Sequence, residues 1–274
     1  MVKRRNKLPA MRYPMVTEQK YRSELKRVVR QLRFLCVKHL HPYLEGWIEG
    51  SDHTQPLRAD ADDWHAELNE QLKRILQGMK APTKAAIEST DGYADAVDSN
   101  NRRDWQRIVR AAYGVNPTKH DQKRYDALIK DWSKANADLI TNIPVKATNQ
   151  IRADVVASLQ TGTTVSDLQD VIQERIDVSD SRAELIARDQ IGKLNGDLTR
   201  ERHAEAGVTQ YVWQTMGDER VRDSHADCDG KTFTWGEPPA DPGCEPGEDF
   251  QCRCWAEPIL PDQMGFELTL QDAA

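Results

Sequence analysis

The residues best suited to chemistry lie near the C-terminus, where four of the five cysteines surround one histidine. The pattern is His225-x-x-Cys228, then Cys244, then Cys252-x-Cys254. Structural zinc takes four thiolate or imidazole ligands in a tetrahedron, and ligands two or three residues apart can reach one ion where the backbone turns or runs as a strand. The spacing therefore predicts a structural zinc site among His225, Cys228, Cys244, Cys252 and Cys254, with one ligand spare.

Other interpretations of the same residues stay open. Cys228 and Cys244 could pair as a disulfide, although a protein made in a reducing compartment disfavours one. Some of the thiols could pack as small apolar side chains, and His225 could be an ordinary hydrogen-bonded loop histidine. The sequence alone favours zinc over these alternatives without choosing the four ligands.

The acidic residues around His225 raise the question of a metal-dependent nuclease. They are Asp218, Asp223, Asp227 and Asp229. Catalytic metal sites keep an open position beside a base, but here the cysteines compete for the metal and the acidic surroundings repel a phosphate backbone. The chain has no phosphate loop, nucleophile elbow or HExxH pattern. We therefore expect no enzyme, with the nuclease as the alternative.

Charge is distributed unevenly along the 274 residues, whose net charge is -6. Residues 1–38 carry twelve lysines and arginines against Glu18 and Glu24, a net charge of +10, whereas the segment from Asp218 to the end has a net charge of -10. The basic segment favours an acidic partner, such as double-stranded DNA, an anionic membrane surface or an acidic protein face. No apolar run approaches the ~18 residues of a membrane span, and no apolar stretch follows the basic start, so we expect no membrane anchor, no secretory signal and synthesis in the cytoplasm.

Hydrophobic periodicity predicts helices through most of the chain. Prolines are expected to end them at Pro42, Pro82 and Pro144, and Gly114 is expected to end another. Beyond Gly207 the β-branched and aromatic run 208–215 predicts a strand, and shorter strands are expected at 231–235 and 253–258. The predicted helices cover, approximately, residues 17–42, 64–81, 97–114, 121–140, 145–159, 167–176 and 180–207.

The expected fold class is α+β, predominantly α-helical, with a small C-terminal module that contains strands, is rich in loops and is stapled by zinc. A module this small has little core of its own and usually needs such a staple. Four regions follow from the changes in sequence texture. They are a basic extended arm (1–15), a helical N-terminal region (16–143), a helical central region (144–207) and a C-terminal module with the His/Cys cluster (208–274).

The C-terminal motifs resemble the signature of the phage Mu F-like head morphogenesis family. The similarity extends upstream through Ile186-Ala187-Arg188-Asp189 to Leu139-Ile140, and to Leu8-Pro9 near the start. Members commonly have Glu at the position of Asp189. Cys228 and Cys244 lie outside the family's common core, so Asp249 is kept as a possible substitute for one of them as a metal ligand. The motifs are Asp218-Glu219-Arg220-Val221-Arg222, His225, Asp229-Gly230-Lys231-x-Phe233, Pro246-Gly247 and Cys252-Arg253-Cys254.

This resemblance implies a virion component, a minor capsid protein that acts in head assembly near the portal. The implied partners are the portal protein and the major capsid or scaffold protein, with DNA met through the basic N-terminal segment. The implied location is the phage head near the portal, and some members are thought to enter the cell with the genome. A nucleic-acid-binding adaptor outside any virion is the further alternative.

Overall fold

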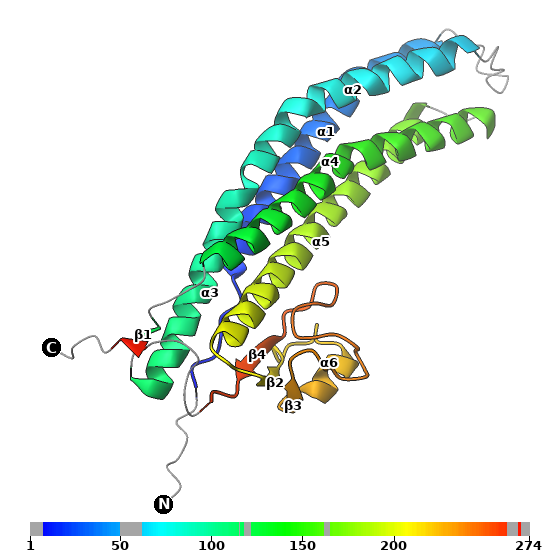
Figure 1. The fold of residues 1–274 in the computed structure, drawn as a ribbon. Coiled ribbons are helices and arrows are strands. Elements are labelled where there is room, and N and C mark those ends of the chain that lie inside the picture. The colour runs from blue at the N-terminus through cyan, green and yellow to red at the C-terminus, as the bar shows by residue number, and fades with distance from the viewer. Residues whose placement is uncertain are drawn as a thin grey trace, which may run out of the picture. The chain divides into compact units, whose positions relative to one another are not determined.

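The computed structural model describes residues 8–49, 62–114, 116–117, 122–161, 165–261 and 268–269. Five long helices make up most of these residues, and a sixth, short helix lies in the C-terminal part (Figure 1). Apolar residues at three- and four-residue spacing form the buried faces of the long helices. The helices are α1 (Met15–Glu49), α2 (Asp62–Glu88), α3 (Thr90–Tyr113), α4 (Gln122–Thr161), α5 (Val165–Glu205) and α6 (Asp223–Cys228).

A small antiparallel sheet follows α5. Its central strand β2 (Gln210–Gln214) pairs with β3 (Thr232–Thr234) on one side and with β4 (Trp255–Pro258) on the other. Alternation along β2 buries Tyr211 and Trp213 on one face, as a half-buried strand requires. A separate two-stranded pair joins β1 (Asn116–Pro117) to β5 (Leu268–Thr269). The predicted α+β class, mostly helical with a small C-terminal sheet, is confirmed, and all three strands expected in this segment are present.

The expected helix ends at prolines are wrong. Pro42, Pro82 and Pro144 all lie inside helices, namely α1, α2 and α4. The apolar stripe of α4 continues across Pro144, with Ile143 and Ala147 buried on either side. A proline removes one backbone hydrogen bond and bends a helix, but burial of a continuous stripe outweighs that loss. The separate helices 167–176 and 180–207 are likewise one helix, α5.

Residues 8–14 belong to the segment expected as an extended arm (1–15), and they have no regular secondary structure. Met11 in this segment is buried with Trp105 and Ile108. The Arg12 backbone N–H donates to the Asp104 carboxylate at 2.6 Å. The pattern of basic residues and prolines gave no indication that Met11 would be buried. Residues 1–7 lie outside the described residues.

The chain forms two compact units, each assembled from separate segments. One contains Met1–Gln19, Asp91–Lys134 and Arg188–Ala274, and the other contains Lys20–Thr90 and Ala135–Ala187. We call the first the site unit, because it holds the His/Cys cluster, and the second the helical unit. None of the helices in the described ranges combines the length and apolar character that a membrane span requires.

A buried polar network holds α3 against the C-terminal half of α5 inside the site unit. Arg202 forms an ion pair with Asp98, and its Nη1 donates to Asn101 Oδ1 at 2.8 Å. The Asn101 amide then donates to Asn195 Oδ1 at 3.0 Å and to Thr199 at 2.8 Å. Because buried charges are costly unless they are paired, this network fixes the register of α5 against α3 within the site unit.

Candidate metal centre

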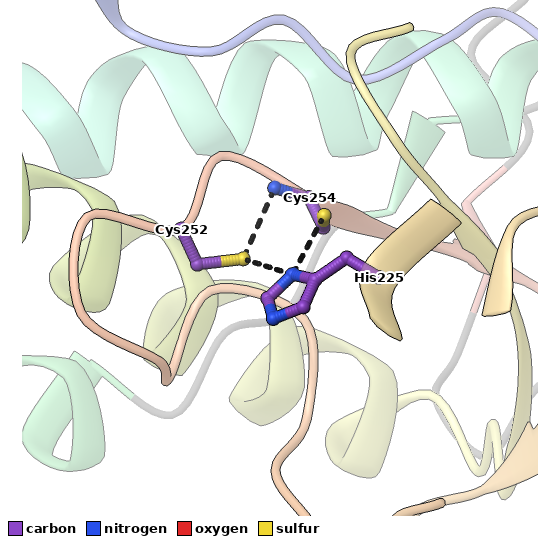
Figure 2. Close-up of side chains that lie close together, drawn as sticks. All are labelled: His225, Cys252 and Cys254. Carbon is purple, nitrogen blue, oxygen red and sulfur yellow. Dashed lines mark hydrogen bonds between the residues drawn. The ribbon is translucent and has the colours of Figure 1, made fainter. Parts of the chain in front are cut away.

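Three of the five predicted ligands come together around one histidine nitrogen (Figure 2). His225 Nδ1 lies 3.4 Å from Cys254 Sγ and 3.5 Å from Cys252 Sγ. All three residues are buried. The Cys254 backbone N–H also approaches Cys252 Sγ, at 3.4 Å. Cys252 and Cys254 follow His225 by 27 and 29 positions in the sequence, yet their two sulfurs and the histidine nitrogen lie close together.

A short helix and the turn before β4, both next to the C-terminal sheet, carry these ligands. His225 lies on α6, and the edge of its ring contacts Trp213 of β2 with ring centroids 5.4 Å apart. Cys252 and Cys254 lie just before β4, rather than within a strand as expected. Both thiols pack in the same apolar cluster as Trp213 and Ala256. The alternating burial of β2 and β4 therefore sets the position of the ligand-bearing turn.

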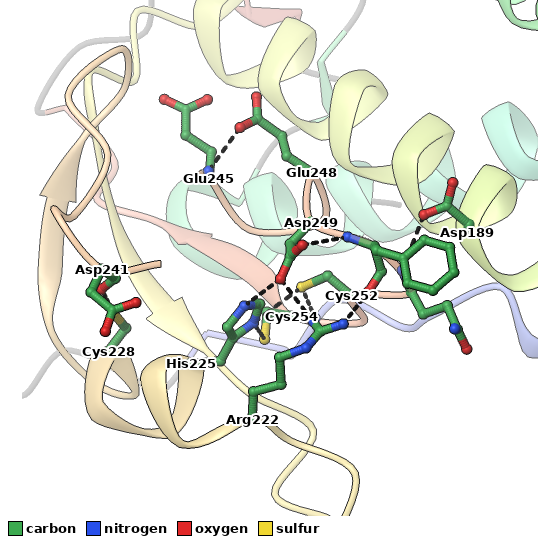
Figure 3. Close-up of polar contacts among 12 residues, drawn as sticks. Asp189, Arg222, His225, Cys228, Asp241, Glu245, Glu248, Asp249, Cys252 and Cys254 are labelled. Carbon is green, nitrogen blue, oxygen red and sulfur yellow. Dashed lines mark hydrogen bonds and ion pairs between the residues drawn. The ribbon is translucent and has the colours of Figure 1, made fainter. Parts of the chain in front are cut away.

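A carboxylate orients the histidine from its other side (Figure 3). His225 Nε2 lies 3.1 Å from Asp249 Oδ2. Arg222 Nη1 donates to the same oxygen at 2.8 Å, and its Nη2 donates to the Phe250 carbonyl at 2.6 Å. A carboxylate that accepts from one ring nitrogen leaves the other free to bind metal, which is the usual outer arrangement of metal-bound histidines. Asp249 therefore orients the His225 ring through its contact with Nε2.

The loop that carries Asp249 and Cys252 lies directly against α5. Two glycines one helical turn apart allow this contact. A Cβ on Gly192 would lie 2.8 Å from the Cys252 carbonyl oxygen, and a Cβ on Gly196 would lie 3.1 Å from the Pro246 carbonyl oxygen. Any larger residue would push the loop away from the helix.

Asp189 fixes the conformation of the same loop. Its Oδ1 accepts the Gln251 backbone N–H at 3.0 Å (Figure 3), and its Oδ2 pairs with Lys193 at 2.9 Å. Gln251 has φ of 56°, a left-handed conformation that a non-glycine residue rarely adopts. Because Cys252 follows directly, Asp189 helps to hold the ligand-bearing turn in place.

The contacts in the cluster shift the proton affinities of its members. The hydrogen bond from the Cys254 thiol lowers the pKa of Cys252, against the effect of burial, and the same contact raises the pKa of Cys254. The hydrogen bond with Cys252 raises the pKa of His225. Burial raises the pKa of Cys244 to about 12. Cys252 is thus the thiol held most nearly as a thiolate, the form that binds metal.

The five predicted ligands are not placed equally. His225, Cys252 and Cys254 have ligand atoms within 4.8 Å of one another, and His225, Cys244 and Asp249 form a second such group. Cys228 belongs to neither group. It is buried in the apolar cluster and its thiol lies 3.7 Å from the Asp241 carbonyl oxygen.

The acidic residues considered for a nuclease are not gathered around His225. Asp218 pairs with Arg253 at 2.7 Å and with Arg220 at 3.3 Å. Asp229 accepts the Thr215 backbone N–H at 2.7 Å. Across the described ranges, neither potential metal group includes Asp218, Asp223, Asp227 or Asp229.

The chemistry of the first group fits zinc. Bond lengths of about 2.3 Å to sulfur and 2.0–2.1 Å to nitrogen in a tetrahedron place nitrogen and sulfur about 3.5 Å apart. The two observed separations between His225 Nδ1 and sulfur are 3.4 and 3.5 Å. The two thiols and the imidazole nitrogen thus supply three of the four ligands that structural zinc takes, at a spacing compatible with one tetrahedral ion.

The sequence did not predict Gly192 and Gly196 as supports of the cluster, nor the supporting contacts of Asp189, Arg222 and Asp249. Gly192 and Gly196, spaced as Gly-x-x-x-Gly on a predicted helix, signal a close approach to another segment. Asp189 stands out in the sequence only as a departure from a family pattern. The contact between Arg222 and Asp249 joins residues 27 positions apart, and no spacing rule identifies such a pair.

Together these features define a helical protein with a small C-terminal module organised around a His/Cys cluster. Residues 149–257 match the family model described as phage Mu protein F like protein. This match assigns residues 149–257 to the phage Mu F-like family. The matched segment contains most of the central region and the complete cluster.

Two curated proteins are similar to the chain. An uncharacterized protein of Haemophilus influenzae is 30% identical over 205 residues, which cover 73% of this chain and 46% of that protein. An uncharacterized protein of Methanocaldococcus jannaschii is 29% identical over 139 residues, covering 51% of this chain and 21% of that protein. The chain thus spans less than half the length of these two relatives. No solved structure matches it.

Proposed function

We propose that this protein is a minor capsid protein of a tailed phage that acts in head assembly next to the portal and is packaged in the virion. The observation that carries the proposal is the match of residues 149–257 to the phage Mu F-like family. In this role the protein acts by binding, and its partners are the portal protein and the major capsid or scaffold protein. We expect no nicking of plasmid DNA with Mg²⁺ or Zn²⁺.

The proposal includes a structural zinc ion in the C-terminal module. His225, Cys252 and Cys254 would hold it. We propose Cys244 as the fourth ligand because, among the described residues, it is the remaining cysteine grouped with His225, in a second group that contains Asp249 in place of Cys252 and Cys254. A bound ion would tie α6 to the turn before β4, which strengthens a module with a small core. The spacing of nitrogen and sulfur described above supports this assignment.

Two buried cysteines provide a matched test of the zinc site. Cys228 and Cys252 are each 4% exposed in the same apolar cluster, but only Cys252 faces His225. We expect Cys252→Ser to lose zinc and Cys228→Ser to keep one equivalent per chain, measured by metal analysis of dialysed protein. Equal zinc content in the two variants would contradict the assignment. Cys244→Ser, measured in the same way, tests the fourth ligand.

The outer face of α1 supports a contact with an acidic partner. Phe34 and Val37 are 57% and 45% exposed, and the exposed side chains of Arg30 and Lys38 lie beside them in the helical pattern. Part of the positive charge of this segment is already balanced within the helical unit, since Lys26 pairs with Asp180 at 2.9 Å. The remaining basic and apolar side chains form a surface suited to an acidic protein face or DNA.

Deleting residues 1–38 would be a poor test of this face, because the segment also supplies buried core residues such as Leu25 and Leu32. Replacing Arg27, Arg30 and Lys38 by Gln instead removes charge from exposed positions. We expect this triple variant to co-purify less with the portal protein, or to retain less DNA, with the difference largest at low salt. Replacing the exposed Arg103, Lys130 and Lys134 by Gln is the control with the same change in charge.

Mass spectrometry of purified particles tests the head role directly. We expect the protein in proheads or virions at low copy number. Its absence from both would overturn the proposed role, whatever the zinc content.

A further inference from the structure

A cavity of about 200 Å³ opens at the His/Cys cluster, where His225, Cys252 and Cys254 form part of its lining. Four arginines also line it. Arg188 comes from α5, Arg220 and Arg222 precede α6, and Arg253 lies between the two cysteines of the cluster. Only four lysines and arginines occur from Asp218 to the C-terminus, and three of them line this one cavity. The positive charge of an otherwise acidic segment is therefore concentrated at one place.

Three of the four guanidinium groups are held in position. Arg253 is anchored by both oxygens of Asp218, at 2.7 and 2.8 Å, and its side chain is 8% exposed. The Asp249 carboxylate and the Phe250 carbonyl hold Arg222. Arg188 Nη1 donates to Gln251 Oε1 at 2.9 Å. Side chains fixed in this way lose little freedom when a ligand binds.

The charge of the cavity is not balanced by its lining. Among the described residues, no aspartate or glutamate lines it. Asp218 is shared by Arg220 and Arg253, and Asp249 is shared by Arg222 and His225. Glu18 lies 3.9 Å from Arg188. Four guanidinium groups thus face three carboxylates, and these contacts leave at least one nitrogen of each guanidinium group for a ligand.

The chemistry of this lining selects a compact anion with several oxygen acceptors. The planar fork of arginine matches phosphate and carboxylate groups, and a group with three terminal oxygens and more than one charge engages several such forks at once. The cavity is smaller than the ~300 Å³ at which sites for drug-sized ligands begin. It therefore has room for one group rather than for a large molecule.

We propose that this cavity binds a phosphate group, the chemistry shared by inorganic phosphate, nucleotides and a nucleic-acid strand. The proposal goes beyond the head role and does not require zinc, because carboxylates, a carbonyl and an amide oxygen hold the arginines. Its failure would leave the zinc content and the particle composition unchanged, so the two proposals are tested separately.

Arg220 is the arginine best suited to a test. It is 55% exposed, and among the described residues its side chain contacts only Asp218, at 3.3 Å, so its removal should leave the fold intact. Arg124, also in the site unit, is 52% exposed and pairs with Glu201. Arg220→Gln and Arg124→Gln therefore make the same change in charge at similar exposure, inside and outside the cavity.

The experiment is a calorimetric titration of full-length protein with inorganic phosphate, at constant ionic strength and equal metal content. We expect saturable binding that Arg220→Gln weakens about tenfold, the size of one lost hydrogen bond between charged groups. Arg220→Lys, which keeps the charge without the fork, should fall between Arg220→Gln and the unchanged protein, and Arg124→Gln should bind normally. Thermal melting checks that each variant is folded.

No saturable binding, or equal weakening by Arg220→Gln and Arg124→Gln, would overturn the proposal. A second arm identifies the source of the phosphate by adding a short single-stranded oligonucleotide to the phosphate titration. Competition that Arg220→Gln abolishes assigns the site to a nucleic-acid phosphate. Phosphate binding without competition assigns it to a free phosphate or a nucleotide.

Discussion

The helical unit and the C-terminal module achieve order in different ways. In the helical unit, long helices bury apolar stripes, and Tyr21, Leu25 and Leu32 are each fully buried on α1. In the C-terminal module the three strands of the sheet β3-β2-β4 are three to five residues long, and individual polar contacts hold the loops. The first arrangement spreads stability over many similar contacts, whereas the second depends on a few residues that have no substitute.

Metal removal should separate the two regions most strongly. If zinc is bound, a structural ion of this type contributes on the order of 10 kcal/mol to folding of the segment that holds it. We expect a chelator to make residues 208–261 sensitive to proteases while the helical signal in far-ultraviolet circular dichroism is retained. If the chelator left the protease resistance of this segment unchanged, the C-terminal module would not depend on metal for its order.

The reverse experiment uses a large core residue of the helical unit. Leu32 is fully buried, and Leu32→Ala should cost about 3 kcal/mol because it removes apolar contact and leaves a cavity. We expect a lower midpoint in urea denaturation of the helical signal with an unchanged zinc content. Loss of zinc in this variant would show that the two regions fold as one.

The difference between the regions also explains what the sequence predicted. A repeating apolar pattern carries its own information, so the helices and the three strands of the sheet were found. The predictions of helix ends at prolines were wrong because they considered only the loss of one backbone hydrogen bond. Burial of the continuous apolar stripe outweighs that loss, as around Pro144 in α4.

In the candidate site, the residue types indicated the metal ligands, but the sequence did not indicate which residues contact one another. His225, Cys252 and Cys254 were identified because few other roles suit such residues together. The separation of Cys228 from the cluster depends on the direction in which α6 presents its side chains, and the arginine cavity depends on residues as distant as Arg188 and Arg220. Contacts over such separations follow from the folded chain rather than from spacing.

A buried histidine in the site unit gives a prediction about pH. His203 is fully buried, and its Nδ1 accepts a hydrogen bond from Trp235 Nε1 at 3.2 Å. Burial lowers the pKa of His203 to about 3. As the pH falls, His203 therefore takes up a proton in the unfolded chain before it does so in the folded protein. The contribution of His203 to the free energy of unfolding is fully present above about pH 6.5 and falls by about 1.4 kcal/mol per pH unit toward pH 3.

Urea denaturation at a series of pH values measures this slope. His203→Gln keeps an acceptor for Trp235 but does not titrate, so its stability should vary less between pH 6.5 and 4.5. An equal slope in the two proteins would assign the acid sensitivity to other groups. Burial raises the pKa of Asp197 to about 6, so this carboxyl titrates in the same range with the opposite effect on stability. Asp197 is present in both proteins, so the difference between their slopes isolates the histidine.

The smallest expected effects come from a pair of helical glycines, and they sharpen the comparison at the level of one methyl group. A Cβ on Gly92 of α3 would meet nothing within 4 Å, whereas a Cβ on Gly192 of α5 would lie 2.8 Å from the Cys252 carbonyl oxygen. Alanine favours the helix over glycine by up to about 1 kcal/mol, so Gly92→Ala should stabilise the protein slightly. Gly192→Ala receives the same benefit but displaces the loop that carries Cys252, and we expect weaker zinc binding together with a lower melting temperature. If both variants gained stability and kept their zinc, the contact between loop and helix would not determine the ligand geometry, and the C-terminal module would tolerate change as the helical unit does.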